Sequence, residues 1–221
     1  MSKALVWDQV GQKTYETGVK NGVLYVMDNS GTYPKGVAWN GLTKVSEKPT
    51  GAETTDLFAD DSKYLSLMSA EKFEASIEAY TYPDEFEQCD GSAEITEGVA
   101  IGQQNRKTFG MAYITTKGND IQNNSYGYKI HLIYGALASP SEKGYSTIND
   151  SPEAITFSWE VKTTPVPVAG FKPTASLTID STKVSEAAMT AIKKVLFGFE
   201  ETDARLPLPD EIKTIIEGTV G

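Results

Sequence analysis

Three segments between residues 107 and 164 alternate regularly between apolar and polar positions. Successive side chains of a strand point to opposite faces, so this period of two predicts strands that each have one apolar face. The positions that share a face within each segment are Phe109, Met111, Tyr113 and Thr115; Tyr126, Tyr128, Ile130, Leu132 and Tyr134; and Ile155, Phe157, Trp159 and Val161. The pattern predicts a β scaffold whose function lies in its surfaces.

Shorter patterned segments precede this stretch. Asn21 and Gly22 lie between two extended runs and predict a hairpin, because both residues tolerate a positive φ. Residues 73–79 alternate as a strand does, although the helix formers in SAEKFEASIEAY also fit a helix. The alternation favours the strand. Counted along the whole chain, the pattern predicts about eight to ten strands.

After residue 180 the period changes to that of a helix. Ser185 predicts an N-cap and Gly198 predicts the end of the helix. The apolar residues at helical spacing are Met189, Ile192, Val195 and Leu196. This stripe predicts a helix packed on the sheet. Pro209 begins a second, short helix that needs a partner surface, either in the same chain or in a neighbouring one.

Three segments lack such regular patterns. Residues 47–62, EKPTGAETTDLFADDS, are polar and acidic and predict a long loop between strands. Loops of this length are either solvated excursions or functional segments, here an arm that orders against a neighbouring subunit. Residues 1–12 predict an N-terminal arm. Residues 199–221 predict a C-terminal arm that includes the second short helix.

The acidic charge of the chain argues against some classes of function. Its 221 residues carry a net charge of −10, with a pI near 4.7. Such an acidic chain repels phosphate backbones, which argues against a nucleic-acid-binding module but not against a surface that DNA passes without binding. Its one cysteine, Cys89, excludes a disulfide framework within the chain, and nearby acids predict an inert thiol. No apolar segment approaches the length of a membrane span, and the start lacks a signal-peptide core.

Candidate chemistry is sparse. His131 is the only histidine, so a zinc site would have to rely on carboxylates, which suit zinc poorly. A Ser–His–Asp triad remains possible in principle, but no G-x-S-x-G motif presents a serine. Carboxylate pairs such as Asp60 and Asp61 fit glycoside hydrolysis, yet thirty acids make such pairs uninformative. We therefore expect no enzyme, no cofactor and no metal.

Aromatic residues leave an alternative open. Eleven tyrosines and three tryptophans could reflect strand composition alone, since aromatic residues favour sheets. Trp39, Tyr80 and Tyr82 would instead bind sugars if they were exposed. The alternative function is therefore a carbohydrate-binding β-sandwich module of a phage or surface adhesin.

Several segments together resemble a known family. They are VLYVMD with KGVAWNGLTKVSE, AEKFEASIEAYTYPDEFEQCDGS, IGQQNRKTFGMAYITTKGND, GYKIHLIYGALASPSEKGYSTINDSPEAITFSWE and KPTASLTIDSTKV. As a set, over residues 22–216, they resemble the major tail (tail tube) proteins of long-tailed, siphovirus-like bacteriophages and related prophages of Gram-positive bacteria.

The resemblance implies one tail tube domain over residues 1–221, a mainly β fold that is sandwich-like or barrel-like, with one packed helix and a short C-terminal helix. It implies hexameric rings that stack into a tube around a tape-measure protein. The tube ends at tail terminator and distal tail proteins, and dsDNA crosses the lumen without specific binding. The resemblance also implies a virion protein, assembled in the host bacterial cytoplasm without contact to a membrane.

The family uses a loop between early strands, and the chain termini, to contact the next ring. By position, these contacts fall in residues 1–12, 47–62 and 200–221. The residues expected at subunit contacts are Pro49, Thr54, Asp56, Leu57, Phe58, Asp60, Asp61, Leu206, Pro207, Leu208, Ile212, Ile215 and Ile216.

Overall fold

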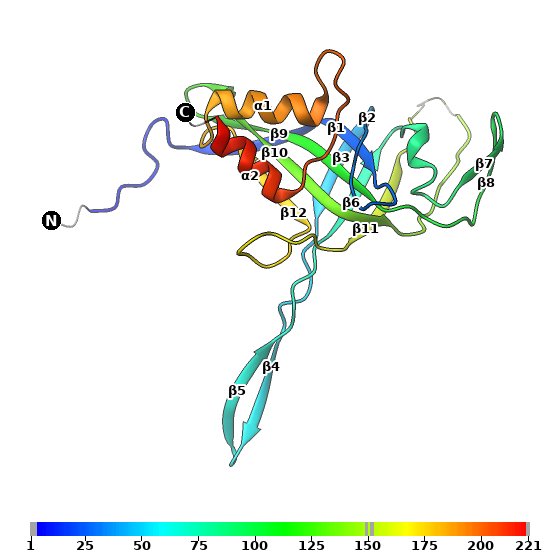
Figure 1. Ribbon diagram of the computed structural model, residues 1–221. Helices are drawn as coiled ribbons and strands as arrows, with labels where there is room; N and C mark the ends of the chain where they lie inside the picture. Colours follow the sequence, from blue (N-terminus) through cyan, green and yellow to red (C-terminus); the bar gives the residue numbers. More distant parts are fainter. Residues whose placement is uncertain (1–3, 149, 151–152, 220–221) are drawn as a thin grey trace.

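The structure, a computed structural model, describes residues 4–148, 150 and 153–219 (Figure 1). Strands hold 45% of the described residues and helices 12%, so the expected mainly β class with two helices is confirmed. The strands are β1 (Thr14–Val26), β2 (Gly36–Trp39), β3 (Leu42–Glu47), β4 (Thr54–Ala59), β5 (Ser62–Met68), β6 (Glu74–Ala79), β7 (Ala93–Thr96), β8 (Val99–Ile101), β9 (Phe109–Asn119), β10 (Asn123–Ala138), β11 (Phe157–Thr163) and β12 (Ser176–Asp180). The helices are the short 3-10 turn η1 (Asp84–Phe86), α1 (Glu186–Phe197) and α2 (Pro209–Gly218).

Eight of these strands form one antiparallel sheet. Its order is β2-β1-β9-β10-β11-β6-β3, and β12 pairs with β10 beside this path. The two ends of the path, β2 and β3, are joined by only Asn40 and Gly41. Three Cα steps of 3.8 Å allow at most about 11 Å between Trp39 and Leu42. The two edges of the sheet must therefore lie close together, and the sheet curls into a barrel-like body.

The curled sheet encloses one core and carries a second core on its outside. The inner core consists of residues such as Leu24, Trp39, Ile77, Met111 and Trp159. In the outer core the sheet packs against α1 and α2 (Figure 1). Its members include Tyr25, Ile130, Leu132, Met189 and Ile192. Strands β1, β9 and β10 contribute to both cores and join them into one body.

Burial on both faces corrects one expectation. Along β9, Met111 faces the inner core and its neighbour Ala112 faces the outer core. The sequence pattern predicts one apolar face for this strand, but helices cover the second face, where small and apolar side chains fit. The expected grouping is otherwise observed, since Phe109, Met111 and Tyr113 share the inner face.

The hairpin expected at Asn21-Gly22 is wrong. Strand β1 continues through this point and pairs with β9 on both sides of it. The register shifts between Thr17 and Val23, and Gly18 and Asn21 have positive φ values of 68° and 53°. The two residues thus accommodate bulges within one long strand rather than a chain reversal.

Two other local predictions are confirmed. Residues 73–79 contain strand β6, with Ala75 and Ile77 buried in the inner core. Helix α1 begins after Ser185, whose Oγ accepts a hydrogen bond from the N–H of Ala188 at 3.3 Å. It ends at Gly198, where φ is 79°.

The N-terminal segment lies outside the body, whereas the C-terminal segment packs on it. Of the expected N-terminal arm, residues 4–12 are described, and they contain no helix or strand. Leu5, Val6, Trp7 and Val10 in this segment are exposed. The expected C-terminal arm instead folds back, because α2 packs on the sheet through the buried Ile212.

Candidate subunit-contact surfaces

The segment expected to be a loop, residues 47–62, is one half of a long hairpin. Strands β4 and β5 pair antiparallel and are connected by Asp60 and Asp61, whose φ values of 50° and 59° define a type I′ turn. We refer to residues 48–72 as the β4–β5 arm. Every residue from 47 to 72 is exposed, and the arm projects from the body (Figure 1).

The sequence contains only a weak signal for this hairpin. A type I′ turn is usually marked by Asn-Gly or Asp-Gly, and here Asp60-Asp61 occupies the two central positions. Aspartate tolerates the left-handed region because its short polar side chain bonds locally. The alternation of Thr55, Leu57 and Ala59 was the remaining signal, and the acidic composition of the segment obscures it.

One face of the arm is apolar. Thr55 pairs with Leu67 and Leu57 pairs with Leu65, so the three leucines lie on the same face. These three leucines are 37–55% exposed. A two-stranded hairpin in water is marginally stable at best without further packing. The arm therefore presents an apolar surface that a partner would cover.

The other face of the arm is mixed. Asp56 Oδ1 lies 2.8 Å from Lys63 Nζ and accepts a hydrogen bond from Ser66 Oγ at 2.6 Å. The contact with Lys63, and to a smaller extent that with Ser66, holds the pKa of Asp56 below its usual value. Phe58 and Met68 on the arm are about 70% exposed. Of the expected contact residues, Pro49, Thr54, Asp56, Leu57, Phe58, Asp60 and Asp61 all lie on this arm.

The base of the arm is closely paired. Thr50 and Lys72 exchange backbone hydrogen bonds of 2.8 and 2.7 Å. Gly51 has a φ of 84°, and a Cβ at this position would lie 2.4 Å from the carbonyl oxygen of Ala70. Only glycine fits such a close approach of two backbones.

Side chains of the body fix the direction in which the arm leaves. The hydroxyl of Tyr113 donates to Glu47 Oε1 at 2.7 Å, and His131 Nδ1 lies 3.5 Å from the same oxygen. The contacts with His131 and Tyr113 hold the pKa of Glu47 below its usual value. Next along the chain, Lys48 Nζ lies 2.7 Å from Glu160 Oε1 on β11.

His131 is held within this network. Its ring stacks on Tyr113 with centroids 4.7 Å apart and an interplanar angle of 4°. Its Nε2 lies 2.9 Å from Thr115 Oγ1 on the neighbouring strand. The only histidine thus fastens β9 and β10 to Glu47 at the end of β3. Among residues 4–148, 150 and 153–219, no group of three or more His, Cys, Asp or Glu side chains is placed to hold a metal ion.

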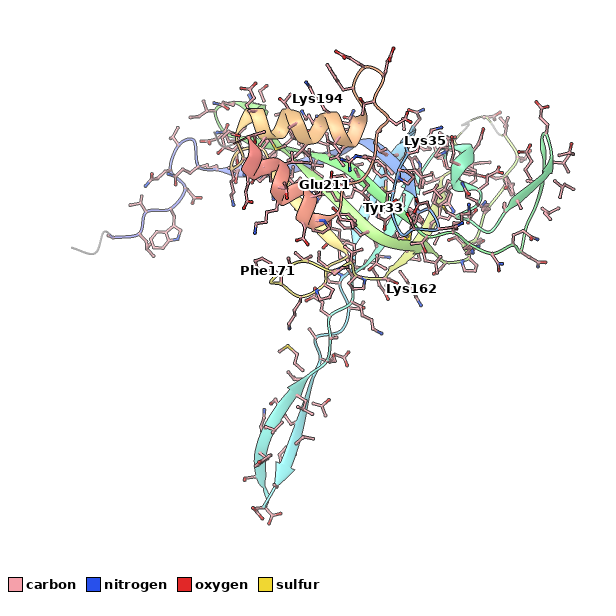
Figure 2. The ribbon with its side chains drawn as sticks, in the orientation of Figure 1. Tyr33, Lys35, Lys162, Phe171, Lys194 and Glu211 are labelled. Carbon is pink, nitrogen blue, oxygen red and sulfur yellow. The ribbon has the colours of Figure 1, made fainter. Side chains whose placement is uncertain are left out.

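The expected C-terminal contact residues lie mostly inside their own chain. Leu206, Pro207 and Ile212, which are expected at subunit contacts, are buried in the outer core region of their own chain. The hydroxyl of Tyr134 donates to the carbonyl oxygen of Pro207 at 3.0 Å, and Tyr33 lies beside the same segment (Figure 2). The partly exposed residues of this set are Leu208, Ile215 and Ile216.

The aromatic residues considered for sugar binding differ in their exposure. Trp39 is buried at 3% exposure and contacts Trp159 and Phe86 with ring centroids 5.7 and 4.7 Å apart. Tyr82 is partly buried against the same cluster, and Tyr80 is exposed. Two of the three tryptophans are therefore core residues. No helix in the described part of the chain has the length and apolar character needed to cross a membrane.

No family model matches this chain, and a search of curated proteins finds no matching relative.

Proposed function

We propose that this protein is a tail tube subunit of a siphovirus-like bacteriophage or prophage, which assembles into hexameric rings stacked as a hollow tube. The observation that carries the proposal is the exposed β4–β5 arm with its apolar face of Leu57, Leu65 and Leu67. An isolated monomer gains little from such an arm, whereas a repeating assembly gives it a partner in every copy.

The barrel-like body supports the same proposal. Its antiparallel sheet has long strands, and among the described residues no strand pairs with the outer edge of β12; such edges can add strands from neighbouring chains. Helices α1 and α2 cover part of one face of the sheet, and the β4–β5 arm and the N-terminal segment 4–12 project from the body (Figure 1). A tube wall needs subunits of this kind, with a rigid body and projecting contact segments.

The charge of the chain suits a conduit for DNA. A net charge of −10 in each subunit, multiplied around a ring, repels the phosphates of dsDNA and lets it pass without binding. In this proposal the further partners are a tape-measure protein inside the tube and the tail terminator and distal tail proteins at its ends. The protein then acts in the virion tail, and its assembly takes place in the host bacterial cytoplasm.

Electron microscopy of the purified protein tests the proposal. Over a range of concentrations, with light scattering as the second measurement, we expect rings or tubes of uniform diameter. A protein that stays strictly monomeric at high concentration and with the partner tail proteins added would contradict it. Binding to a glycan array without polymerisation would instead support the carbohydrate-binding alternative.

A further inference from the structure

An apolar groove lies between strand β12 and helix α2. It has a volume of about 630 Å³. Ile179 and Ile212 are buried beneath it, and partly exposed apolar side chains surround them. These surrounding residues are Leu177, Val184 and Ile216. The groove thus offers apolar surface next to the edge of a strand.

The outer edge of β12 is open. Hydrogen bonds from Tyr134 N to Ala175 O at 2.8 Å and from Ser181 N to Tyr128 O at 3.0 Å show that the odd-numbered residues of β12 bond to β10. In an antiparallel ladder the residues between them direct their N–H and C=O groups outward. No ladder in the described part of the chain reaches the outward groups of Thr178. A strand from another chain can pair there.

The groove is lined by three lysines, Lys129, Lys183 and Lys213, and by two acids, Asp180 and Glu217, so it is less acidic than the chain as a whole. Lys183 is exposed and forms no ion pair with any described residue. Lys213 is 67% exposed, and its Nζ lies 3.9 Å from Oε1 of Glu217, which also lines the groove. The acid Asp180 is already neutralised by Lys117, 2.7 Å away. An acidic segment is therefore favoured at this rim.

The β4–β5 arm has the complementary features. Its apolar face carries Leu57, Leu65 and Leu67, and its tip carries Asp60 and Asp61, which form no ion pair among the described residues. The N-terminal segment 4–12 is also apolar and exposed, but its single acid is Asp8. Charge complementarity thus favours the arm over the N-terminal segment as the occupant of the groove.

We propose that the groove between β12 and α2 accepts the β4–β5 arm of a second copy of this chain. Strand β5 pairs with the open edge at Thr178, Leu65 and Leu67 cover the apolar floor, and the aspartates at the tip reach Lys183 and Lys213. This inference rests on the proposed function, since it assigns the surface that receives the arm in the assembly.

Site-specific cross-linking tests the docking directly. The only native cysteine, Cys89, is fully buried, so it does not interfere with introduced cysteines. Asp61→Cys in one copy and Lys183→Cys in a second copy that carries a small tag are mixed and oxidised. We expect a disulfide-linked heterodimer, and none when the second copy carries Lys44→Cys on the exposed side of β3. A link from Val6→Cys to Lys183→Cys in place of that from Asp61→Cys would overturn the arm as the occupant.

Charge reversal provides a second test with a built-in rescue. K183E/K213E and D60K/D61K should each raise the concentration needed for assembly at least roughly tenfold, because like charges then face each other in the contact. A mixed arm-and-groove variant carrying all four changes should recover most of the assembly. The control K162E/K194E alters two lysines outside the groove lining and should assemble as the wild type does (Figure 2).

The outcomes separate this inference from the proposed function. Wild-type tubes that are unaffected by K183E/K213E, together with no cross-link at Lys183, would overturn the groove and leave the tail tube proposal intact. A wild type that forms neither rings nor tubes would overturn the tail tube proposal and the inference with it.

Discussion

Glu47 Oε1 lies 2.7 Å from the hydroxyl oxygen of Tyr113, and this contact joins the last residue of β3 to a strand of the barrel-like body. Because the β4–β5 arm begins at the next residue, the contact sets the direction in which the arm leaves the body. Burial and the carboxylate of Glu47 both raise the pKa of Tyr113, so its hydroxyl stays protonated and donates to Glu47.

Glu47→Gln should weaken this connection. We expect the free energy of unfolding at neutral pH to fall by about 1 kcal/mol or less, since the side chain is partly exposed and water screens the interaction. The lowered pKa of Glu47 means that its contribution is present above the ordinary glutamate pKa of about 4.3 and is lost as the pH falls through the lower folded-state value.

Urea unfolding over a pH series measures this effect. The stability difference between wild type and E47Q should shrink as the pH falls below about 4.3. Glu53→Gln, in the exposed part of the arm, is the matched control. A difference that grows toward acid pH would contradict the assigned network.

Removing the arm should separate folding from assembly. Deletion of residues 53–69 joins Ala52 to Ala70. It removes only exposed residues and leaves all residues of the inner and outer cores in place. We expect a folded monomer with a cooperative thermal transition by circular dichroism and no rings or tubes by electron microscopy. A deletion variant that fails to fold would show that the arm is part of the core, and one that assembles normally would show that the arm is dispensable.

The apolar face of the arm can be tested by itself. The triple substitution L57S/L65S/L67S changes exposed side chains, so each should alter the free energy of unfolding by no more than about 0.5 kcal/mol. Assembly, followed by light scattering, should require a markedly higher protein concentration. F58S/M68S alters exposed apolar residues away from the leucine face and should have the smaller effect. Equal effects of both variants would argue against a face-specific contact.

Gly51→Ala tests the close approach at the base of the arm. The new Cβ would lie 2.4 Å from Ala70 O at a positive φ, so the two backbone segments must separate and redirect the arm. We expect assembly to be lost while the thermal transition of the body is preserved. Gly98 has a similar φ of 75°, but a Cβ added there would meet open space. Gly98→Ala therefore measures the cost of placing alanine at a positive φ without a steric clash. Normal tubes from G51A would contradict the role of this position.

Local features of the fold followed from the sequence. The alternation over residues 73–79, the Ser185 cap and the Gly198 stop each depend on neighbouring residues only, and each is observed. The sequence did not predict which strands pair with each other. Strand β2 pairs with β1, whereas β3, which begins only two residues later, pairs with β6. Such long-range choices depend on how the entire sheet closes, which no short pattern records.

The candidate contact surface was predictable in part. The sequence located the arm around residues 47–62, but it assigned a loop, because Asp60-Asp61 is a weak turn signal and the acidic composition of the segment obscures the alternation. The C-terminal contacts were assigned to apolar residues such as Leu206 and Ile212, which turned inward. Hydrophobicity alone does not distinguish a residue that packs within its chain from one that packs on a neighbour.

The contact between Glu47 and Tyr113 depends on the closure of the barrel-like body, because it joins the end of β3 to β9. Hairpin β4–β5 joins residues close in sequence and can form within microseconds, whereas the barrel depends on distant pairings that form much later. Until β3 takes its place at the seam, Glu47 has no Tyr113 to hold it, and the arm has no fixed direction. In the proposed assembly, a copy whose strand β3 is not yet in place lacks this contact and has no correctly aimed arm to offer to a second copy.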